Sequence, residues 1–198
     1  FLSYFSSDQV RTQIIHGGFK AKELLEKMPK NSVTSYGFVN QMDLKFKNES
    51  ASLGFTTPSF SNGSAYGDLD GDGDLDLVVN NENGEAFIYR NMTSERTHAH
   101  YLKVALKGNG MNTLGVGAKV TIYAGGIQQL LEQTPTRGFE SSVDPVLNFG
   151  LGTVKKVDSV RVVWSDMKMQ VLKNIDVNTN LNLKESDAKL TYVPVGIG

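Results

Sequence analysis

Apolar and polar residues alternate along the second half of this 198-residue chain. The alternation is found at 101–108, 118–124 and 158–164, and further strands are expected at 127–133, 168–175 and 180–185. A period of two puts every second side chain on the same face of a strand, so each segment is expected to bury one face. Gly125-Gly126 joins two of the segments and predicts a hairpin. Half-buried strands joined by tight turns predict an antiparallel β-sandwich or barrel over residues 95–188.

The N-terminal part of the chain has a helical pattern. Ala21, Leu24, Leu25 and Met28 are spaced i, i+3, i+4 and i+7, which places them on one helical face. We therefore expect an N-terminal helical segment within residues 1–35.

Residues 36–94 are short β-leaning segments separated by Gly, Asn, Asp, Ser and Pro. Asn83-Gly84 predicts a hairpin between strands over 75–80 and 85–89. Residues 189–198 are expected to form a tail. The predicted fold class is mostly β, with an N-terminal helical segment, a small β unit and a larger sandwich or barrel.

Composition excludes several classes of protein. The net charge is −1 and there is no Cys, so the basic surface of a nucleic-acid binder, disulfides and thiolate chemistry are not expected. No apolar run reaches the length of a membrane span, so membrane insertion is not expected either. The chain begins with Phe1 rather than Met, which favours a processed product or a piece of a longer chain.

A dense run of acidic residues stands between two of the predicted strands. Residues 68–76, called the acidic loop below, contain five aspartates, Asp68, Asp70, Asp72, Asp74 and Asp76. Alternating acids separated by small residues suit Ca²⁺, which takes about 6–8 oxygen ligands. We expect one carboxylate oxygen from each of the first three aspartates, the backbone carbonyl after Gly73, and a two-oxygen contact from the last. Gly71 and Gly73 permit the positive φ angles that fold the loop around an ion.

The acidic loop fits only the first half of an EF-hand, because the twelfth position counted from Asp68 is Val79 rather than Glu. A calcium loop that leads into a β-hairpin is the interpretation we favour. The alternatives are a solvated acidic turn without an ion, and Mg²⁺, which prefers fewer carboxylates and more waters.

Two resemblances follow from these motifs. The stretch around Asp-Leu-Asp-Gly-Asp-Gly-Asp-Leu-Asp-Leu-Val-Val, within residues 36–92, resembles an FG-GAP or VCBS repeat, the calcium-loop blade of integrin-type β-propellers. Residues 100–185 resemble an ASPIC and UnbV domain, through Leu-Gly-Val-Gly-Ala-Lys-Val, Arg-Gly-Phe-Glu-Ser-Ser and Phe-Gly-Leu-Gly. This chain has Asn148 where that family commonly has His. The resemblances imply the C-terminal part of an exported bacterial protein with further propeller blades upstream.

Other candidate motifs favour structural roles. The glycine-rich segment 114–118 leads into a strand, not the helix that a phosphate site needs, so a tight turn is expected. His98 and His100 are expected to be ordinary exposed histidines, and Trp164 to pack in the core. For Arg137 and Phe139 we favour an ion pair and core packing over contact with a ligand.

The sequence predicts a non-enzymatic, calcium-binding β module, with Ca²⁺ in a structural role. Its partners are expected to be a glycan or protein ligand and the rest of its own longer chain. Its expected location is the periplasm or cell surface, where an outer-membrane lipoprotein is one option. The alternative is a metal-dependent hydrolase of phosphate esters or glycans, because clustered carboxylates also hold catalytic ions.

Overall fold

The computed structural model describes Asp8, Thr12 and residues 31–194. The predicted helix around Ala21–Met28 and the last four residues lie outside the described residues. The chain divides into two compact units, with the boundary between Phe60 and Ser61. No helix of the described part is long and apolar enough to cross a membrane.

The first unit contains a two-stranded antiparallel sheet of β1 (Phe38–Asn40) and β2 (Phe46–Asn48). Its connecting turn holds three consecutive residues with positive φ, Met42, Asp43 and Leu44. An isolated antiparallel bridge also pairs Val33 with Ser59.

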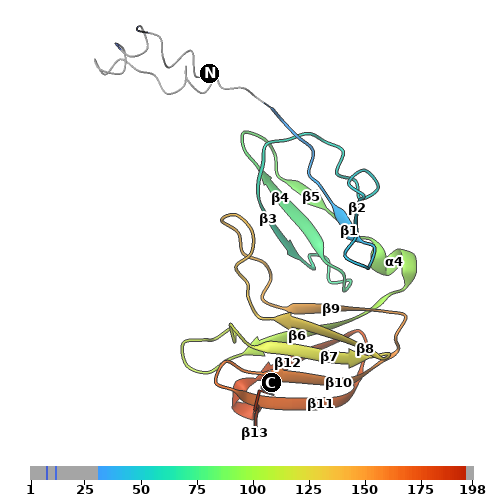
Figure 1. The fold of residues 1–198 in the computed structure, drawn as a ribbon, viewed down its shortest axis with the longest axis vertical. Helices are drawn as coiled ribbons and strands as arrows, with labels where there is room; N and C mark the ends of the chain where they lie inside the picture. Colours follow the sequence, from blue (N-terminus) through green and yellow to red (C-terminus); the bar gives the residue numbers. More distant parts are fainter. Residues whose placement is uncertain (1–7, 9–11, 13–30, 195–198) are drawn as a thin grey trace. The chain divides into compact units, whose positions relative to one another are not determined.

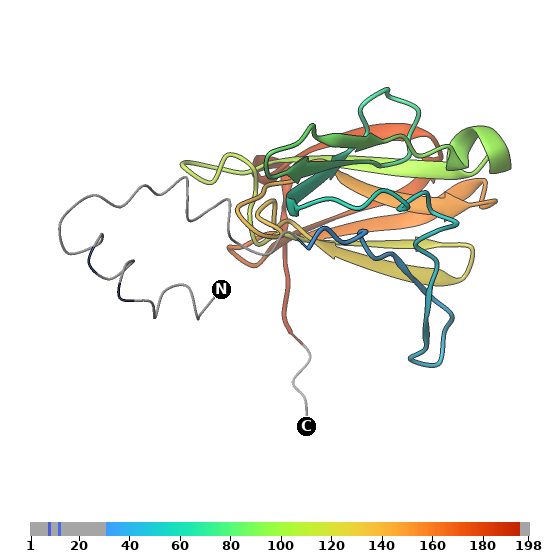
Figure 2. The same ribbon diagram turned by 90° about the horizontal axis from the view of Figure 1, so that it is seen from above.

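The second unit begins with a three-stranded antiparallel sheet of β3 (Ser61–Gly67), β4 (Asp76–Asn81) and β5 (Phe87–Tyr89), with β4 in the middle (Figure 1). The β4–β5 pairing confirms the hairpin predicted around Asn83-Gly84. Helix α4 (Thr93–Thr97), the coiled green ribbon in Figure 2, then leads into the larger sheets.

Two further sheets form a β-sandwich. One has the order β13-β11-β10-β7-β8 and the other β12-β6-β9. The strands are β6 (His100–Lys107), β7 (Lys119–Ala124), β8 (Ile127–Glu132), β9 (Leu147–Gly152), β10 (Lys156–Val163), β11 (Lys168–Asp176), β12 (Thr179–Lys184) and β13 (Leu190–Thr191), with a 3-10 turn at Glu185–Asp187. This confirms the predicted mostly-β fold and the sandwich. None of the sheets in the described residues closes into a barrel.

Alternate residues of the sandwich strands form one core, as the period of two predicts. The buried members are Leu102, Val104, Leu106, Ala118, Val120, Ile122, Ala124, Phe149, Leu151, Val157, Val160, Val162, Trp164, Leu183 and Ala188. Trp164 is buried, which confirms its predicted place in the core. The predicted turn at 114–118 is also confirmed, since Gly115 and Gly117 have φ angles of 64° and 86°.

One strand pair is parallel, whereas the sequence predicts an antiparallel sandwich. β12 runs parallel to β6, with Thr179 opposite Leu102. The link from β11 is only two residues long and carries the chain from one sheet to the other, so β12 cannot fold back beside β11. Asn178 in this link has a φ of 56°, and its N–H donates to the Tyr101 carbonyl at 2.7 Å.

Candidate metal centre

The acidic loop spans the gap between β3 and β4. Gly67 and Asp76, at its two ends, are directly opposite each other in the strand ladder, so the loop is closed at its base. Gly71 and Gly73 have φ angles of 82° and 102°, as the predicted folding of the loop requires. Gly73 is also needed for space, because a Cβ atom there would overlap the ring of Tyr101.

Backbone N–H groups of the loop point at its first carboxylates. Asp68 accepts hydrogen bonds from Gly71 N–H at 2.7 Å on Oδ1 and from Gly73 N–H at 2.9 Å on Oδ2. Asp70 and Asp72 each accept one from the N–H two residues further along, at 3.3 and 3.0 Å. These bonds offset part of the repulsion between the aspartates and fix the direction in which each carboxylate points.

Asp76 is the most deeply placed carboxylate of the loop, with only 3% of the residue exposed. Its Oδ2 accepts from Leu69 N–H at 2.9 Å, and its Oδ1 accepts from Asn91 N–H at 2.8 Å. Asp76 therefore ties the start of the loop to the segment that follows β5.

The five predicted ligands fall into two groups. One carboxylate oxygen from each of Asp68, Asp70 and Asp76 lies within 4.8 Å of the other two. Asp72 and Asp74 form a second such group with Glu95 of α4. The sequence analysis missed Glu95, because the side chain comes from a helix that no local pattern connects to the loop.

Helix α4 contacts the second group through its first turn. Ser94 donates its backbone N–H to Asp74 Oδ2 at 2.8 Å and its hydroxyl to Asp72 Oδ2 at 2.9 Å. The other oxygen of Asp74, Oδ1, is buried and has no hydrogen-bond partner. A buried carboxylate oxygen without a partner is costly, and a cation or an ordered water would satisfy it.

Two basic side chains from outside the loop form ion pairs with its carboxylates. Lys103 of β6 forms an ion pair with Asp68, whose side chain is almost fully buried. Arg90, after β5, pairs with Asp70 through Nε at 2.8 Å and also with Glu95. These cations partly neutralise the acidic loop, and the sequence analysis missed both because they come from segments outside the loop.

The pKa values of two carboxylates in the loop are shifted in opposite directions. The N–H of Asp74 donates to Asp72 and is the main reason that the pKa of Asp72 is lowered. Burial raises the pKa of Asp74, and the charges of its acidic neighbours add to the rise. The carboxylates of Asp70 and Glu95 raise the pKa of Arg90.

The loop also contacts the sandwich. Asn148 of β9 donates from Nδ2 to the Gly73 carbonyl at 2.9 Å, and its own Oδ1 is buried without a partner. Together with Lys103 and Tyr101 of β6, this contact joins the acidic loop to the smaller sheet of the sandwich.

The residues present fit a calcium ion. Two oxygens on opposite sides of Ca²⁺, each about 2.4 Å from it, are about 4.8 Å apart. One oxygen from each of Asp68, Asp70 and Asp76 lies within this distance of the other two, so the three carboxylates are close enough together to share one ion. Their donor set is oxygen only, as Ca²⁺ prefers, and the Lys103 ammonium, which pairs with Oδ2 of Asp68, would compete with an ion for that carboxylate.

The remaining candidate residues lie elsewhere. His98 is exposed, as expected, whereas His100, which was also expected to be exposed, is half-buried with Nδ1 3.1 Å from Asn178 Nδ2. The predicted core position of Phe139 is wrong, since the residue is 61% exposed. Arg137 is exposed, and within the described part of the chain it has no ion-pair partner. Gly138 and Glu140 have positive φ angles of 78° and 45°, and this turn directs the Phe139 ring outward.

The comparisons with known proteins agree with part of the expected relationship. No curated protein matches the chain. The acidic loop and β3–β5 lie outside the family match, so their resemblance to an FG-GAP or VCBS repeat stays a prediction. Residues 108–190, which contain the strands from β7 to β12, match the family model described as ASPIC and UnbV.

Proposed function

We propose that this chain is a calcium-stabilised, non-enzymatic binding module of a larger exported protein. The observation that carries the proposal is the position of Asp68, Asp70 and Asp76, each of which has a carboxylate oxygen within 4.8 Å of an oxygen of the other two. Export and a larger parent protein are supported by the resemblance of residues 108–190 to ASPIC and UnbV domains.

Electrostatics explains why an ion would stabilise this loop. Asp68 and Asp76 are held in place by backbone N–H groups, so they cannot move apart to reduce their repulsion. Lys103 offsets one of these charges, and Arg90 offsets charge at the exposed side. Ca²⁺ supplies two positive charges at one point and leaves the β3–β4 connection ordered.

A structural rather than catalytic role is supported by how the carboxylates are used. Both oxygens of Asp68 and both oxygens of Asp76 accept backbone N–H groups, so these side chains form part of the local backbone structure. A catalytic ion needs an open position and a neighbouring base, and the hydrogen bonds of these side chains supply neither.

The proposal is tested by thermal unfolding of the chain in 10 mM CaCl₂, 10 mM MgCl₂ or EDTA. For a dissociation constant of about 0.1 mM, in the range of extracellular calcium modules, 10 mM Ca²⁺ adds about 2.7 kcal/mol of stability. This corresponds to a rise in melting temperature on the order of 10 °C. Mg²⁺ should give a smaller rise. An unchanged transition in Ca²⁺ contradicts the proposal.

Lys103→Met gives the test a sharper form. In EDTA this variant should melt below the wild type, because Asp68 then lies buried without its counter-ion. When Ca²⁺ is added, the melting temperature of the variant should rise more than that of the wild type, because no ammonium competes for the Asp68 carboxylate. Lys107→Met, at an exposed position of the same strand, is the matched control and should behave like the wild type.

A further inference from the structure

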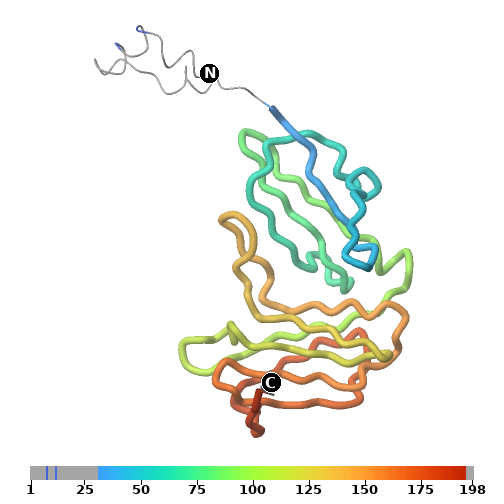
Figure 3. The backbone as a smooth tube through the Cα atoms, viewed as in Figure 1, coloured from blue at the N-terminus to red at the C-terminus, as the bar shows by residue number. Residues whose placement is uncertain are grey.

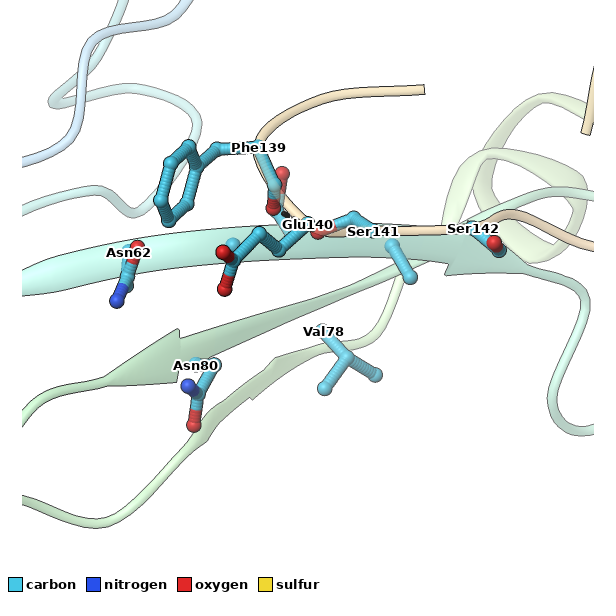
Figure 4. A pocket seen from close by; sticks show the side chains of 10 residues that line it. Asn62, Val78, Asn80, Phe139, Glu140, Ser141 and Ser142 are labelled. Atoms are coloured by element: carbon cyan, nitrogen blue, oxygen red, sulfur yellow. Dashed lines mark hydrogen bonds between the residues drawn. The ribbon is translucent and has the colours of Figure 1, made fainter. Parts of the chain in front are cut away.

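A polar groove lies on the second unit, away from the carboxylates of the acidic loop. It has a volume of about 310 Å³ and lies between the β3–β4 sheet and the connection from β8 to β9 (residues 133–146). We call it the Phe139 groove; the side chains that matter below are Asn62, Asn80, Phe139 and Glu140 (Figure 4). Its volume is at the lower end of the range for small-ligand sites.

The wall of the groove is built by close backbone packing. Figure 3 shows that the β8–β9 connection extends away from the sandwich strands, and its later part pairs with β3 through Asp144 N–H and the Tyr66 carbonyl at 3.3 Å. A Cβ atom on Gly63 would lie 2.5 Å from Ser141 Oγ and 2.9 Å from the Phe139 carbonyl. The loop thus rests directly on β3 because position 63 has no side chain.

The connection is also fixed at its base and within its turn. Gln133 is buried and donates from Nε2 to the carbonyls of Leu114 and Pro145, at 3.0 and 2.8 Å. An isolated bridge joins Thr136 to Ser142 across the turn. The Phe139 groove is therefore formed by a constrained loop on a sheet, which limits the entropy that binding must overcome.

The groove presents unused polar groups. Among the described residues, the side chains of Asn62, Asn80 and Glu140 have no hydrogen-bond partner. The two amides and the carboxylate offer both hydrogen-bond donors and acceptors to a ligand in the groove. Figure 4 shows the Asn62 and Asn80 side chains on neighbouring strands, with the Glu140 side chain beside Asn62 and above Asn80.

The aromatic ring completes the arrangement. Phe139 is 61% exposed at the rim of the groove, beside Asn62 in Figure 4. An exposed ring next to amides and a carboxylate suits a ligand that has an apolar face and several hydroxyl groups around its edge. A pyranose ring has this combination. Glu140 supplies the groove's charge, so its negative sign disfavours acidic sugars.

We propose that the Phe139 groove binds a neutral carbohydrate, with one sugar ring stacked on Phe139 and its hydroxyls hydrogen-bonded to Asn62, Asn80 and Glu140. The proposal deepens the proposed function by naming the ligand class, and it rests on that function only in taking the chain as a binding module. The groove residues are not among the carboxylates of the acidic loop, so the calcium proposal and this one can fail separately.

The test applies the full chain, in Ca²⁺, to a printed array of neutral gluco-, manno-, galacto- and xylo-oligosaccharides with uronate-containing counterparts. We expect retention on neutral oligosaccharides and weaker retention on the uronates. The best neutral binder is then titrated calorimetrically. Phe139→Ala should weaken its binding about tenfold, which corresponds to about 1.4 kcal/mol. Phe46→Ala, at another exposed phenylalanine, should leave binding unchanged.

Asn62→Ala is the second groove variant, because its exposed side chain can be removed without loss of a hydrogen bond in the described structure. It should also weaken binding, with an unchanged melting temperature. The absence of any neutral binder overturns the inference, as does binding that survives both groove substitutions. The array is repeated in EDTA and compared with the melting experiment to separate the two proposals. If the chain binds glycans but its melting temperature does not respond to Ca²⁺, the metal claim fails and the carbohydrate proposal remains.

Discussion

Asp76 organises the acidic loop, and Asp76→Asn removes one of its charges at nearly constant volume. The wild-type carboxylate accepts Leu69 N–H at 2.9 Å and Asn91 N–H at 2.8 Å from a position that is 3% exposed. An amide has a single oxygen, so one of these donors faces an NH₂ group in the variant. The loss of one charge-assisted hydrogen bond costs about 1.5–3 kcal/mol, and the opposed donors add to it. We expect a total loss of about 2–4 kcal/mol.

The assay is urea unfolding in EDTA, followed by the same titration in 10 mM CaCl₂. The unfolding midpoint of Asp76→Asn should fall with an unchanged slope, since the surface exposed on unfolding stays the same. The added stability from Ca²⁺ should also largely disappear, because a proposed ligand is lost. Both effects are expected from one substitution.

Asp70→Asn separates the two effects. Its carboxylate is more exposed and pairs with Arg90, an interaction worth about 0–1 kcal/mol at a surface. This variant should unfold near the wild-type midpoint in EDTA and yet lose much of the calcium response. If Asp76→Asn keeps the wild-type midpoint in EDTA, the reasoning about its two hydrogen bonds is refuted. A full calcium response in Asp76→Asn refutes its role as a ligand.

Two further substitutions test the packing behind the loop and the groove. Gly73→Ala should lower the free energy of unfolding by at least about 2 kcal/mol, because φ is 102° and the new methyl overlaps Tyr101. In urea unfolding, the additional substitution Tyr101→Ala should restore part of this stability. Gln133→Ala should lower the free energy of unfolding by about 2–4 kcal/mol, because two carbonyls lose a buried donor and a cavity forms. A variant that melts at the wild-type temperature would contradict this prediction.

The sequence predicted those features that depend on local pattern. The alternation over residues 118–124 placed β7 correctly, and Gly125-Gly126 predicted its hairpin with β8, where both glycines have positive φ. The predicted pairing of the strands around Asn83-Gly84 was equally local. Each of these features is determined within a few residues of chain.

The remaining features depend on contacts between distant segments. The parallel pairing of β12 with β6 follows from a two-residue crossing between sheets, which no periodicity reveals. The pairing of Lys103 with Asp68 joins residues 35 positions apart. The sequence analysis favours core packing for Phe139, but the left-handed φ angles on either side of it turn the ring to the surface.

The most direct test of the account is a crystal structure of the chain grown with 10 mM CaCl₂, with data collected at a wavelength where calcium scatters anomalously. The account predicts an anomalous peak among the carboxylates of Asp68, Asp70 and Asp76, with the Lys103 ammonium withdrawn from Asp68. A map without a peak in the acidic loop, and with Lys103 still paired to Asp68, contradicts it.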